Sequence, residues 1–465
     1  MLETKVITQQ LAREMEEQIP KLMVAARVPG ISIALIHESK TSWHRAFGVA
    51  NAATHEPVTD NTLFEAASLS KPVFAYAVLK MIDRGMLNLD SPLSDFLPEP
   101  YVNDERIRQI TARIVLDHTT GFPNWRPKGQ PLKIHFSPGE KFSYSGEGYV
   151  YLQKAVEQIT GEQVDEFLQE TVFNPLGMSA SSYVWPKHYG QLSSTGHNLA
   201  GAPVEKKKWV HANVASSLHT TALDYAKFIV AVINGIGLQP KSNKDMMTPQ
   251  VKLDEERETD IDEHVTRLSS VLSWGLGWGL ENFDQTQYFW HWGNNRIFRS
   301  FVIASRDTHT GMVILTNSAN GLSIVDEITR IVTGRKHPAI SWLSYDQYDS
   351  AGMKFISSVL RDGADNAMRE YYTAIRKSNM PLPLEKDVNR WSREFLEMEK
   401  VEEALKISQW NTMLYPKSWK AYNRIAEAYL IHGDRQLAIQ SLNKSLELNP
   451  NNYSTLDQLK ILKKL

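Results

Sequence analysis

The sequence has 465 residues, a net charge of −2 at neutral pH and no cysteine. A net charge this close to zero gives no overall positive potential that would attract nucleic acid or an acidic membrane. The lack of cysteine excludes disulfides and thiolate catalysis. The length is large for one domain, and no apolar run is long enough to span a membrane.

The first predicted elements are a helix and a strand. Apolar residues recur at helical spacing over 8–26, and Val28-Pro29-Gly30 then leads into an apolar strand at 31–36. The segment from Met1 to Pro20 is acidic and amphipathic, whereas an export signal has a charged region followed by an apolar one. We expect a cytoplasmic protein if the chain is complete, and a periplasmic or secreted one if a signal has been removed.

The pattern Ser68-Leu69-Ser70-Lys71 carries the first chemical signal. On a helix, this spacing places the Ser68 hydroxyl and the Lys71 amine on the same face, so that a nucleophile lies beside its base. The pattern follows a strand-like segment at 62–67 and opens an apolar stretch at 72–79 that is typical of a buried helix. Ser68 should therefore lie near a helix N-terminus, whose backbone N–H groups favour a developing oxyanion.

Further polar motifs and elements follow in chain order. Tyr144-Ser145-Gly146 precedes a predicted helix, and His291-Trp292-Gly293 lies at the end of a predicted strand. Helices that separate the early strand from the late ones favour an α+β fold, with an antiparallel sheet, flanking helices and a helical subdomain. The sequence predicts helices at 148–159, 164–172 and 221–234, and strands at 288–292, 299–305 and 312–316.

From about residue 347 the sequence becomes a succession of helices with a repeating period. Ala404 and Ala438 are 34 residues apart (438 − 404), as are Pro416 and Pro450 (450 − 416). This period is typical of tetratricopeptide-like helix pairs, which bury their apolar faces on a neighbouring repeat. We predict two domains, 1–345 and 346–465, the second an all-α repeat module. A second Ser-x-x-Lys pattern, Ser441 to Lys444, would then lie on a repeat helix as surface chemistry.

The three motifs, in this order, resemble the signatures of the penicillin-recognising serine hydrolases. The likeness is to the class C β-lactamase-like branch, which includes DD-peptidases, D-aminopeptidases and esterases. It extends over roughly residues 10–335 and includes Leu116-Asp117-His118-Thr119-Thr120-Gly121, Pro175-Leu176-Gly177-Met178, Trp274-Gly275-Leu276-Gly277-Trp278 and Leu315-Thr316-Asn317.

The resemblance implies a β-lactamase- or transpeptidase-like domain that reacts through an acyl-Ser68 intermediate. The proton of Ser68 would pass to Lys71 or to Tyr144, and the sequence leaves open which of them is the general base. An ordinary lysine has a pKa near ~10.4, so the surroundings of Lys71 must lower its pKa. The resemblance also implies an oxyanion hole made by the backbone N–H groups of Ser68 and Asn294. No metal or other cofactor is expected.

Two departures from the family pattern bear on the substrate. Gly146 stands where many relatives have asparagine, and His291 stands where many have lysine. Without the asparagine side chain, a substrate amide should be held weakly. A histidine is mostly neutral at pH 7, so a substrate carboxylate should be held weakly as well. We expect weak or absent β-lactamase activity. The residues expected to contact substrate are His291, Trp292, Gly293, Gly146, Glu147 and Arg296.

Some of these side chains have a plainer interpretation. Glu147 and Arg296 could be solvated or ion-paired surface charges, and His118 is expected to brace a helix end. The aromatic residues Trp290, Trp292 and Phe298 predict an apolar wall near the mouth of the site, which would suit an acyl ester or an apolar peptide group.

The sequence thus predicts a serine hydrolase that acts on esters or on small D-amino-acid-type amides and peptides. Two alternatives remain: an acyl or peptidyl transferase with the same intermediate, and an inactive ligand sensor whose repeats deliver the output. The expected partners are a small-molecule or short-peptide substrate and, through the repeats, a protein or peptide; no nucleic acid and no membrane span are expected. The repeats could equally serve only to buttress the first domain.

Overall fold

The protein is described from a computed structural model that covers residues 9–126, 129–253, 271–283, 285–378, 382–450 and 452–464. The first eight residues of the segment Met1 to Pro20 lie outside this description. The chain forms two compact units, Met1–Tyr348 and Asp349–Leu465. No helix among the described residues combines the length and the apolarity needed to cross a membrane.

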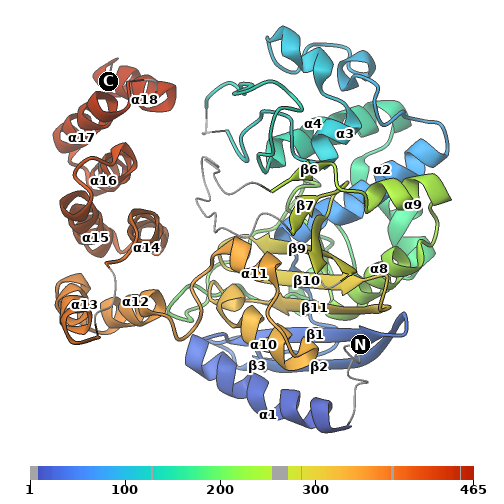
Figure 1. Ribbon diagram of the computed structural model, residues 1–465, viewed down its shortest axis with the longest axis horizontal. Coiled ribbons are helices and arrows are strands. Elements are labelled where there is room, and N and C mark those ends of the chain that lie inside the picture. Colours follow the sequence, from blue (N-terminus) through green and yellow to red (C-terminus); the bar gives the residue numbers. More distant parts are fainter. Residues whose placement is uncertain are drawn as a thin grey trace. The chain divides into compact units, whose positions relative to one another are not determined.

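An antiparallel sheet is the centre of the first unit (Figure 1). Its order within the described residues is β3-β2-β1-β11-β10-β9-β8-β7-β6, so that the N-terminal hairpin pairs with the last strand of the unit. The strands are β1 (Gly30–His37), β2 (Lys40–Asn51), β3 (Glu56–Pro57), β6 (Val251–Lys252), β7 (Leu272–Trp274), β8 (Gly279–Phe283), β9 (Thr286–Asn294), β10 (Arg299–Ser305) and β11 (Thr310–Thr316).

Helices cover both faces of the sheet, and β1 shows why. Its residues Ile31 and Ile33 belong to a buried cluster with α1 (Gln9–Ala26) and α10 (Val325–Thr333), whereas Ala34 and Ile36 join a second cluster with α8 (Ala222–Asn234). Successive side chains of a strand point to opposite faces, so a strand buried on both sides is apolar throughout. This explains the unbroken apolar run that the sequence shows at 31–36.

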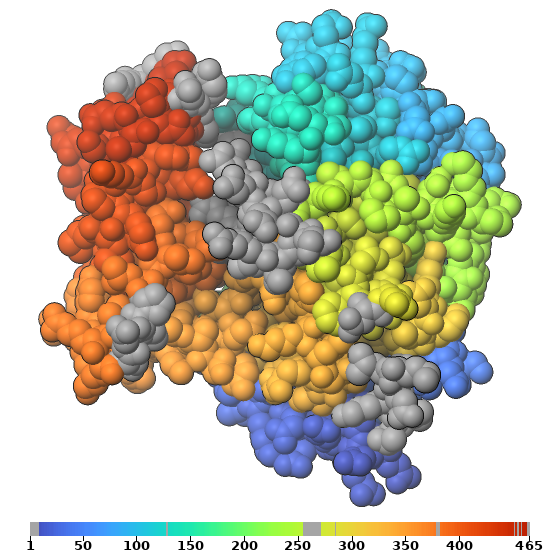
Figure 2. All heavy atoms as spheres, viewed as in Figure 1, coloured from blue at the N-terminus to red at the C-terminus, as the bar shows by residue number. Residues whose placement is uncertain are grey.

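The remaining helices of the first unit gather mainly beside the sheet. In the space-filling view the light-blue to teal segment, which includes α3 and α4, forms a continuous lobe beside the yellow-green segment that holds α9 (Figure 2). The longer helices are α2 (Ser70–Asp83), α4 (Gly146–Thr160), α9 (Pro240–Met246) and α11 (Pro338–Leu343); the shorter are α3 (Ala112–Leu116), α5 (Val164–Leu168), α6 (Asn174–Leu176) and α7 (Tyr189–Leu192).

The structure confirms the fold class and most of the predicted elements, and it also contains strands that the sequence analysis did not predict, among them β6, β7 and β8. The segment 62–67 contributes only β4 (Phe64–Glu65), which pairs with β5 (His219–Thr220), before the chain turns into the Ser68 region. The sequence analysis also did not identify β2, because most of its side chains are exposed or half-buried and carry no alternating apolar signal.

The second unit consists of helices in its described residues. They are α12 (Ala351–Asp362), α13 (Ala364–Ser378), α14 (Glu385–Glu397), α15 (Val401–Leu414), α16 (Trp419–His432), α17 (Arg435–Leu448) and α18 (Tyr453–Lys464). The starts of α14 and α16 are 34 residues apart (419 − 385), and so are those of α15 and α17 (435 − 401). A helix pair therefore recurs with the period seen in the sequence, and its assignment as tetratricopeptide-like stays a prediction.

Candidate active site

Ser68 lies in a tight turn that the surrounding structure holds from both sides. The 3₁₀ turn Ala67–Leu69 runs directly into α2, and Ala67 has a left-handed backbone (φ 51°) that costs energy for a residue with a Cβ atom. The hydroxyl of Ser70 donates to the carbonyl of Ala67 at 2.5 Å and accepts the N–H of Leu218 at 3.0 Å. These bonds fix the turn, while Ser68 itself stays half-buried.

Lys71 is the immediate neighbour of the Ser68 hydroxyl. Its Nζ lies 3.1 Å from Ser68 Oγ and donates to the carbonyl of Ala215 at 2.8 Å. The side chain is fully buried, and this desolvation lowers the pKa of Lys71 well below its usual value. Burial on the apolar helix α2 thus provides the lowered pKa that the proposed role of Lys71 requires.

Tyr144 lies on the other side of the amine. Lys71 Nζ is 4.7 Å from the centroid of the Tyr144 ring, and Tyr144 Oη is 3.5 Å from Nε2 of His291. The ring packs on Trp292, with 4.7 Å between centroids, and on His118, with 4.2 Å. The three sequence motifs therefore meet at one place, although they are far apart in the chain.

His291 is buried on β9 and is neutral over the ordinary pH range. Burial is the main cause that lowers the pKa of His291 to about 3, and the charge of Lys71 adds to it. Its Nδ1 lies 2.8 Å from the carbonyl of Trp292. An imidazole in this state supplies no positive charge for a substrate carboxylate.

Gly293 allows β9 to approach the nucleophile turn closely. A Cβ atom at this position would lie 2.3 Å from the carbonyl oxygen of Ala66 and 3.3 Å from the Cβ of Ala67. Any larger residue would push the strand away from the turn that carries Ser68. The glycine of the His-x-Gly motif is therefore a packing requirement of the site.

His118 supports the backbone around Tyr144. Its Nδ1 accepts the N–H of Ser145 at 3.0 Å, and its carbonyl accepts the N–H of Ser143 at 2.7 Å. Ser145 is the N-cap of α4, and its hydroxyl accepts the N–H of Gly148 at 2.9 Å. His118 thus braces the start of a helix, as the sequence predicts.

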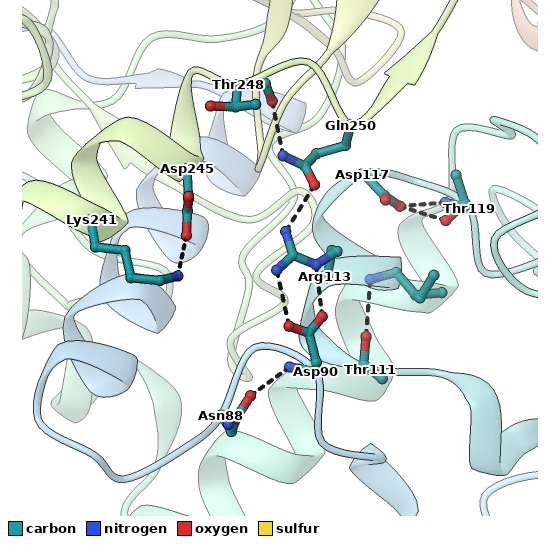
Figure 3. Close-up of polar contacts among 11 residues, drawn as sticks. Asn88, Asp90, Thr111, Arg113, Asp117, Thr119, Lys241, Asp245, Thr248 and Gln250 are labelled. Carbon is teal, nitrogen blue, oxygen red and sulfur yellow. Dashed lines mark hydrogen bonds and ion pairs between the residues drawn. The ribbon is translucent and has the colours of Figure 1, made fainter.

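The segment before His118 is tied to the edge of the sheet (Figure 3). Arg113 of α3 donates to both carboxylate oxygens of Asp90, at 2.7 and 3.0 Å, and to Oε1 of Gln250 at 2.8 Å. Asp117 accepts both the N–H and the hydroxyl of Thr119, and its burial raises its pKa to about 6. Because α3 leads directly into His118, these contacts fix the support of the catalytic region.

Gly146 and Glu147 begin α4 beneath a loop that the sequence analysis did not identify. The carbonyl of Asn124 accepts the N–H groups of both residues at 3.1 Å, and Glu147 Oε1 accepts the N–H and the Nε of Arg126 at 3.0 Å each. Glu147 is buried, so its interpretation as a solvated charge is wrong. It secures the loop that carries Trp125.

The residues after His291 differ in burial. Asn294 donates through Nδ2 to Tyr345 Oη at 2.8 Å, and Arg296 is exposed at a left-handed position (φ 70°). Trp290, Trp292 and Phe298 are buried in the two cores, and Trp292 packs on Tyr144, so an apolar wall near the mouth of the site stays a prediction. Aromatic side chains in a late strand mark a core here, because both faces of the sheet are covered.

Asn295 is a further contact that the motifs did not reveal. Its Nδ2 donates to Glu65 Oε2 at 2.9 Å and to the carbonyl of Ser216 at 3.1 Å. It thus connects the segment just before Ser68 with the segment that binds Lys71 through Ala215. Within the described residues, no three His, Asp or Glu side chains lie together in a way that could hold a metal ion.

Comparison with known proteins agrees with this geometry. The model of the Beta-lactamase family matches residues 9–332 of the 465. The chain belongs to the beta-lactamase family. The family match covers the proposed catalytic residues and stops before the second unit, and it places the first unit in a family of serine hydrolases that resembles the penicillin-binding proteins.

Two penicillin-binding proteins are similar in sequence to this chain. Penicillin-binding protein 4 of Amycolatopsis lactamdurans is 25% identical over 344 residues, which is 69% of this chain and 88% of that protein. Penicillin-binding protein 4* of Bacillus subtilis (strain 168) is 30% identical over 159 residues, 30% of this chain and 34% of that protein.

Two solved structures share the fold of this beta-lactamase family member. The octameric penicillin-binding protein homologue from Pyrococcus abyssi has a TM-score of 0.60 at 21% identity and covers 75% of this chain and 82% of that chain. The D-alanine carboxypeptidase AmpC from Burkholderia cenocepacia has a TM-score of 0.58 at 18% identity, covering 70% of this chain and 99% of that one.

Proposed function

We propose that the protein is a serine hydrolase that forms an acyl intermediate on Ser68 and acts on esters or on small D-amino-acid-type amides. The observation that carries the proposal is the position of Lys71. Its amine is buried and lies 3.1 Å from Ser68 Oγ, and burial lowers its pKa well below that of an ordinary lysine, which favours the unprotonated form that could take the Ser68 proton.

In the first step, Ser68 Oγ attacks the acyl carbon while its proton passes to Nζ of Lys71. The bond to the leaving group then breaks, and the proton is delivered to the leaving oxygen or nitrogen. Tyr144, whose ring lies beside Nζ, is the proposed carrier of this proton. In the second step, water attacks the acyl-enzyme, loses its proton to the same base, and releases the acid and Ser68.

The oxyanion of each step needs donors near Ser68. We propose the backbone N–H groups of Ser68 and Asn294 for this role. The support is the close packing of β9 on the nucleophile turn, which Gly293 permits and which brings the end of β9 to the Ser68 turn.

The residues at positions 146 and 291 favour esters over β-lactams as substrates. Gly146 offers no side-chain amide, and the low pKa of His291 leaves the imidazole uncharged at neutral pH. A carboxylated β-lactam would thus have weaker partners than a short ester. Penicillins and cephalosporins should acylate slowly or turn over slowly.

The test is intact-mass analysis of the full chain after treatment with a fluorophosphonate, a cephalosporin and p-nitrophenyl acetate, followed by peptide mapping. We expect a single adduct on Ser68. Ser441→Ala is a matched control, because it removes the hydroxyl of the second Ser-x-x-Lys pattern. An adduct on another serine, with the Ser68→Ala protein fully active, would refute the proposal. Added amines or alcohols that divert the acyl group would show transfer in place of hydrolysis.

A further inference from the structure

The indole of Trp125 lies over the N-terminal end of α4. A Cβ atom at Gly146 would lie 2.7 Å from two indole carbons of Trp125 and 3.0 Å from the carbonyl of Asn124. Real Cβ atoms do not come that close to a ring, so any side chain at position 146 requires Trp125 to move. The indole and a residue larger than glycine therefore exclude one another.

The loop that carries Trp125 is held firmly against α4. The carbonyl and Oδ1 of Asn124 accept the N–H of Gly146 at 3.1 and 3.0 Å, and the carbonyl of Pro123 accepts the Ser145 hydroxyl at 2.9 Å. On the other side, the backbone N–H and the guanidinium of Arg126 bind the buried Glu147. Trp125 lies between these two anchors, so its indole has little freedom to leave Gly146.

Trp125 is also partly exposed to solvent. The residue is 36% exposed, which is unusual for tryptophan in this domain. Gly146 lies two residues after Tyr144, whose ring is 4.7 Å from Lys71 Nζ, and Nζ is 3.1 Å from Ser68 Oγ. The partly exposed indole therefore lies over the start of α4, two residues along the chain from the tyrosine that packs beside Lys71.

We propose that Trp125 is a specificity-determining residue that takes the place of a polar side chain at position 146. It forms an apolar acyl subsite, so the enzyme selects esters with an apolar acyl chain over substrates that carry an acylamido group at this point. The inference rests on the proposed function. A partly exposed indole gains from contact with methylene groups and leaves an amide without hydrogen-bond partners.

The first test measures selectivity in the full-length protein. Trp125→Ala should lower the ratio of kcat/KM for p-nitrophenyl hexanoate to that for p-nitrophenyl acetate about tenfold, because an apolar pocket contact discriminates by about that factor. Met86→Ala removes another partly exposed apolar side chain, beyond the far end of α2, and should leave the ratio unchanged.

The second test measures the packing between Trp125 and position 146. Gly146→Ala should lower Tm in the wild-type protein, and the loss should be clearly smaller in the Trp125→Ala background. Gly148→Ala is the matched control, since its Cβ would meet Thr120 at 3.1 Å and should cost the same in both backgrounds. The double variant Trp125→Ala/Gly146→Asn should gain kcat/KM on a cephalosporin with an acylamido side chain relative to Trp125→Ala alone.

The outcomes separate the inference from the function on which it rests. An active enzyme whose hexanoate-to-acetate ratio does not change in Trp125→Ala refutes the inference and leaves the proposed function standing. Equal Tm losses for Gly146→Ala in both backgrounds refute it as well. A wild-type protein that forms no adduct on Ser68 and hydrolyses none of the esters refutes the proposed function, and the selectivity claim falls with it.

Discussion

The chain contains the same four-residue spacing twice, and the two copies differ in every physical property that matters for catalysis. Lys71 is fully buried beside Ser68, and desolvation lowers its pKa. Lys444 is half-exposed on α17 and forms an ion pair with Glu447 at 2.8 Å, which raises its pKa. The hydroxyl of Ser441 donates back to the carbonyl of Leu437 at 2.9 Å. An amine that stays protonated cannot act as a base.

This comparison shows that the spacing supplies only the proximity of the two side chains. Whether the lysine is a base depends on the neighbours that remove water from it and on the absence of a carboxylate beside it. For Lys71 the neighbours come from α2, the Tyr144 segment and the carbonyl of Ala215. For Lys444 the neighbour is a glutamate one turn along the same helix, a surface pair of small energetic consequence.

The largest difference is expected from removing the two hydroxyls. Ser68→Ala should reduce kcat on p-nitrophenyl acetate by about 10⁶, the loss typical of a removed covalent nucleophile. Ser441→Ala should retain the wild-type kcat. Steady-state kinetics on both purified variants, with circular dichroism to check folding, measure this. Comparable losses in the two variants would erase the distinction between the copies.

The two lysines should differ next. Lys71→Met should lower kcat by about 10²–10⁴, the usual range for a general base, while Lys444→Met should have no effect on it. Tyr144→Phe should also cause a large loss, and the double variant Lys71→Met/Tyr144→Phe should lose less than the sum because both groups serve one proton relay. Strictly additive losses in ΔΔG‡ would show that the two side chains act separately.

The pH profile follows from the lowered pKa of Lys71. The base must be unprotonated, so kcat/KM should rise as pH increases through the pKa of the folded state and reach a plateau well below the usual lysine pKa. His291 has a pKa of about 3, so KM for a carboxylate-bearing substrate should show no inflection between about pH 5 and 8. A KM that falls as pH drops through about 6.5 would assign His291 a charge that its burial excludes.

Stability should change with pH in a related way. Burial lowers the pKa of Lys71 in the folded state, whereas the unfolded chain binds this proton below about 10.4, so stability is lost as pH falls from that value toward the lowered folded-state pKa. Lys71→Met removes this penalty and should gain Tm relative to wild type, more at neutral pH than at alkaline pH. Thermal unfolding at several pH values of both proteins measures the gain, with Lys444→Met as the reference.

The smallest effect concerns the second unit, which carries the inactive copy. A chain that ends at Tyr348 should keep ester hydrolysis close to that of the full protein, because every proposed catalytic residue lies in the first unit. A chain that ends at Trp342 loses Tyr345, whose hydroxyl accepts from Asn294, and should have a lower kcat. A folded chain ending at Tyr348 without activity on the acetate ester would show that the helical unit completes the site.

The sequence alone determined the features that depend on local order along the chain. The apolar run at 31–36, the helical spacing at 8–26, the apolar helix after Ser68 and the period of 34 residues each predicted an element that the structure contains. The three motifs also predicted that Ser68, Lys71, Tyr144 and His291 lie close together, because the order and composition of the motifs resemble the active-site signatures of a known family. The fold class and the family are confirmed on this basis.

Only the tertiary structure decided what surrounds those residues. The carbonyl of Ala215 at Lys71, the ion pair that buries Glu147 and the indole of Trp125 over Gly146 come from segments distant in sequence from the groups they contact. Strand β2 was not predicted because most of its side chains are exposed or half-buried, so its sequence has no alternating apolar pattern. Its backbone pairs with β1, and this pairing depends on the tertiary structure. Burial is a property of the packed chain, and burial is what separates Lys71 from Lys444.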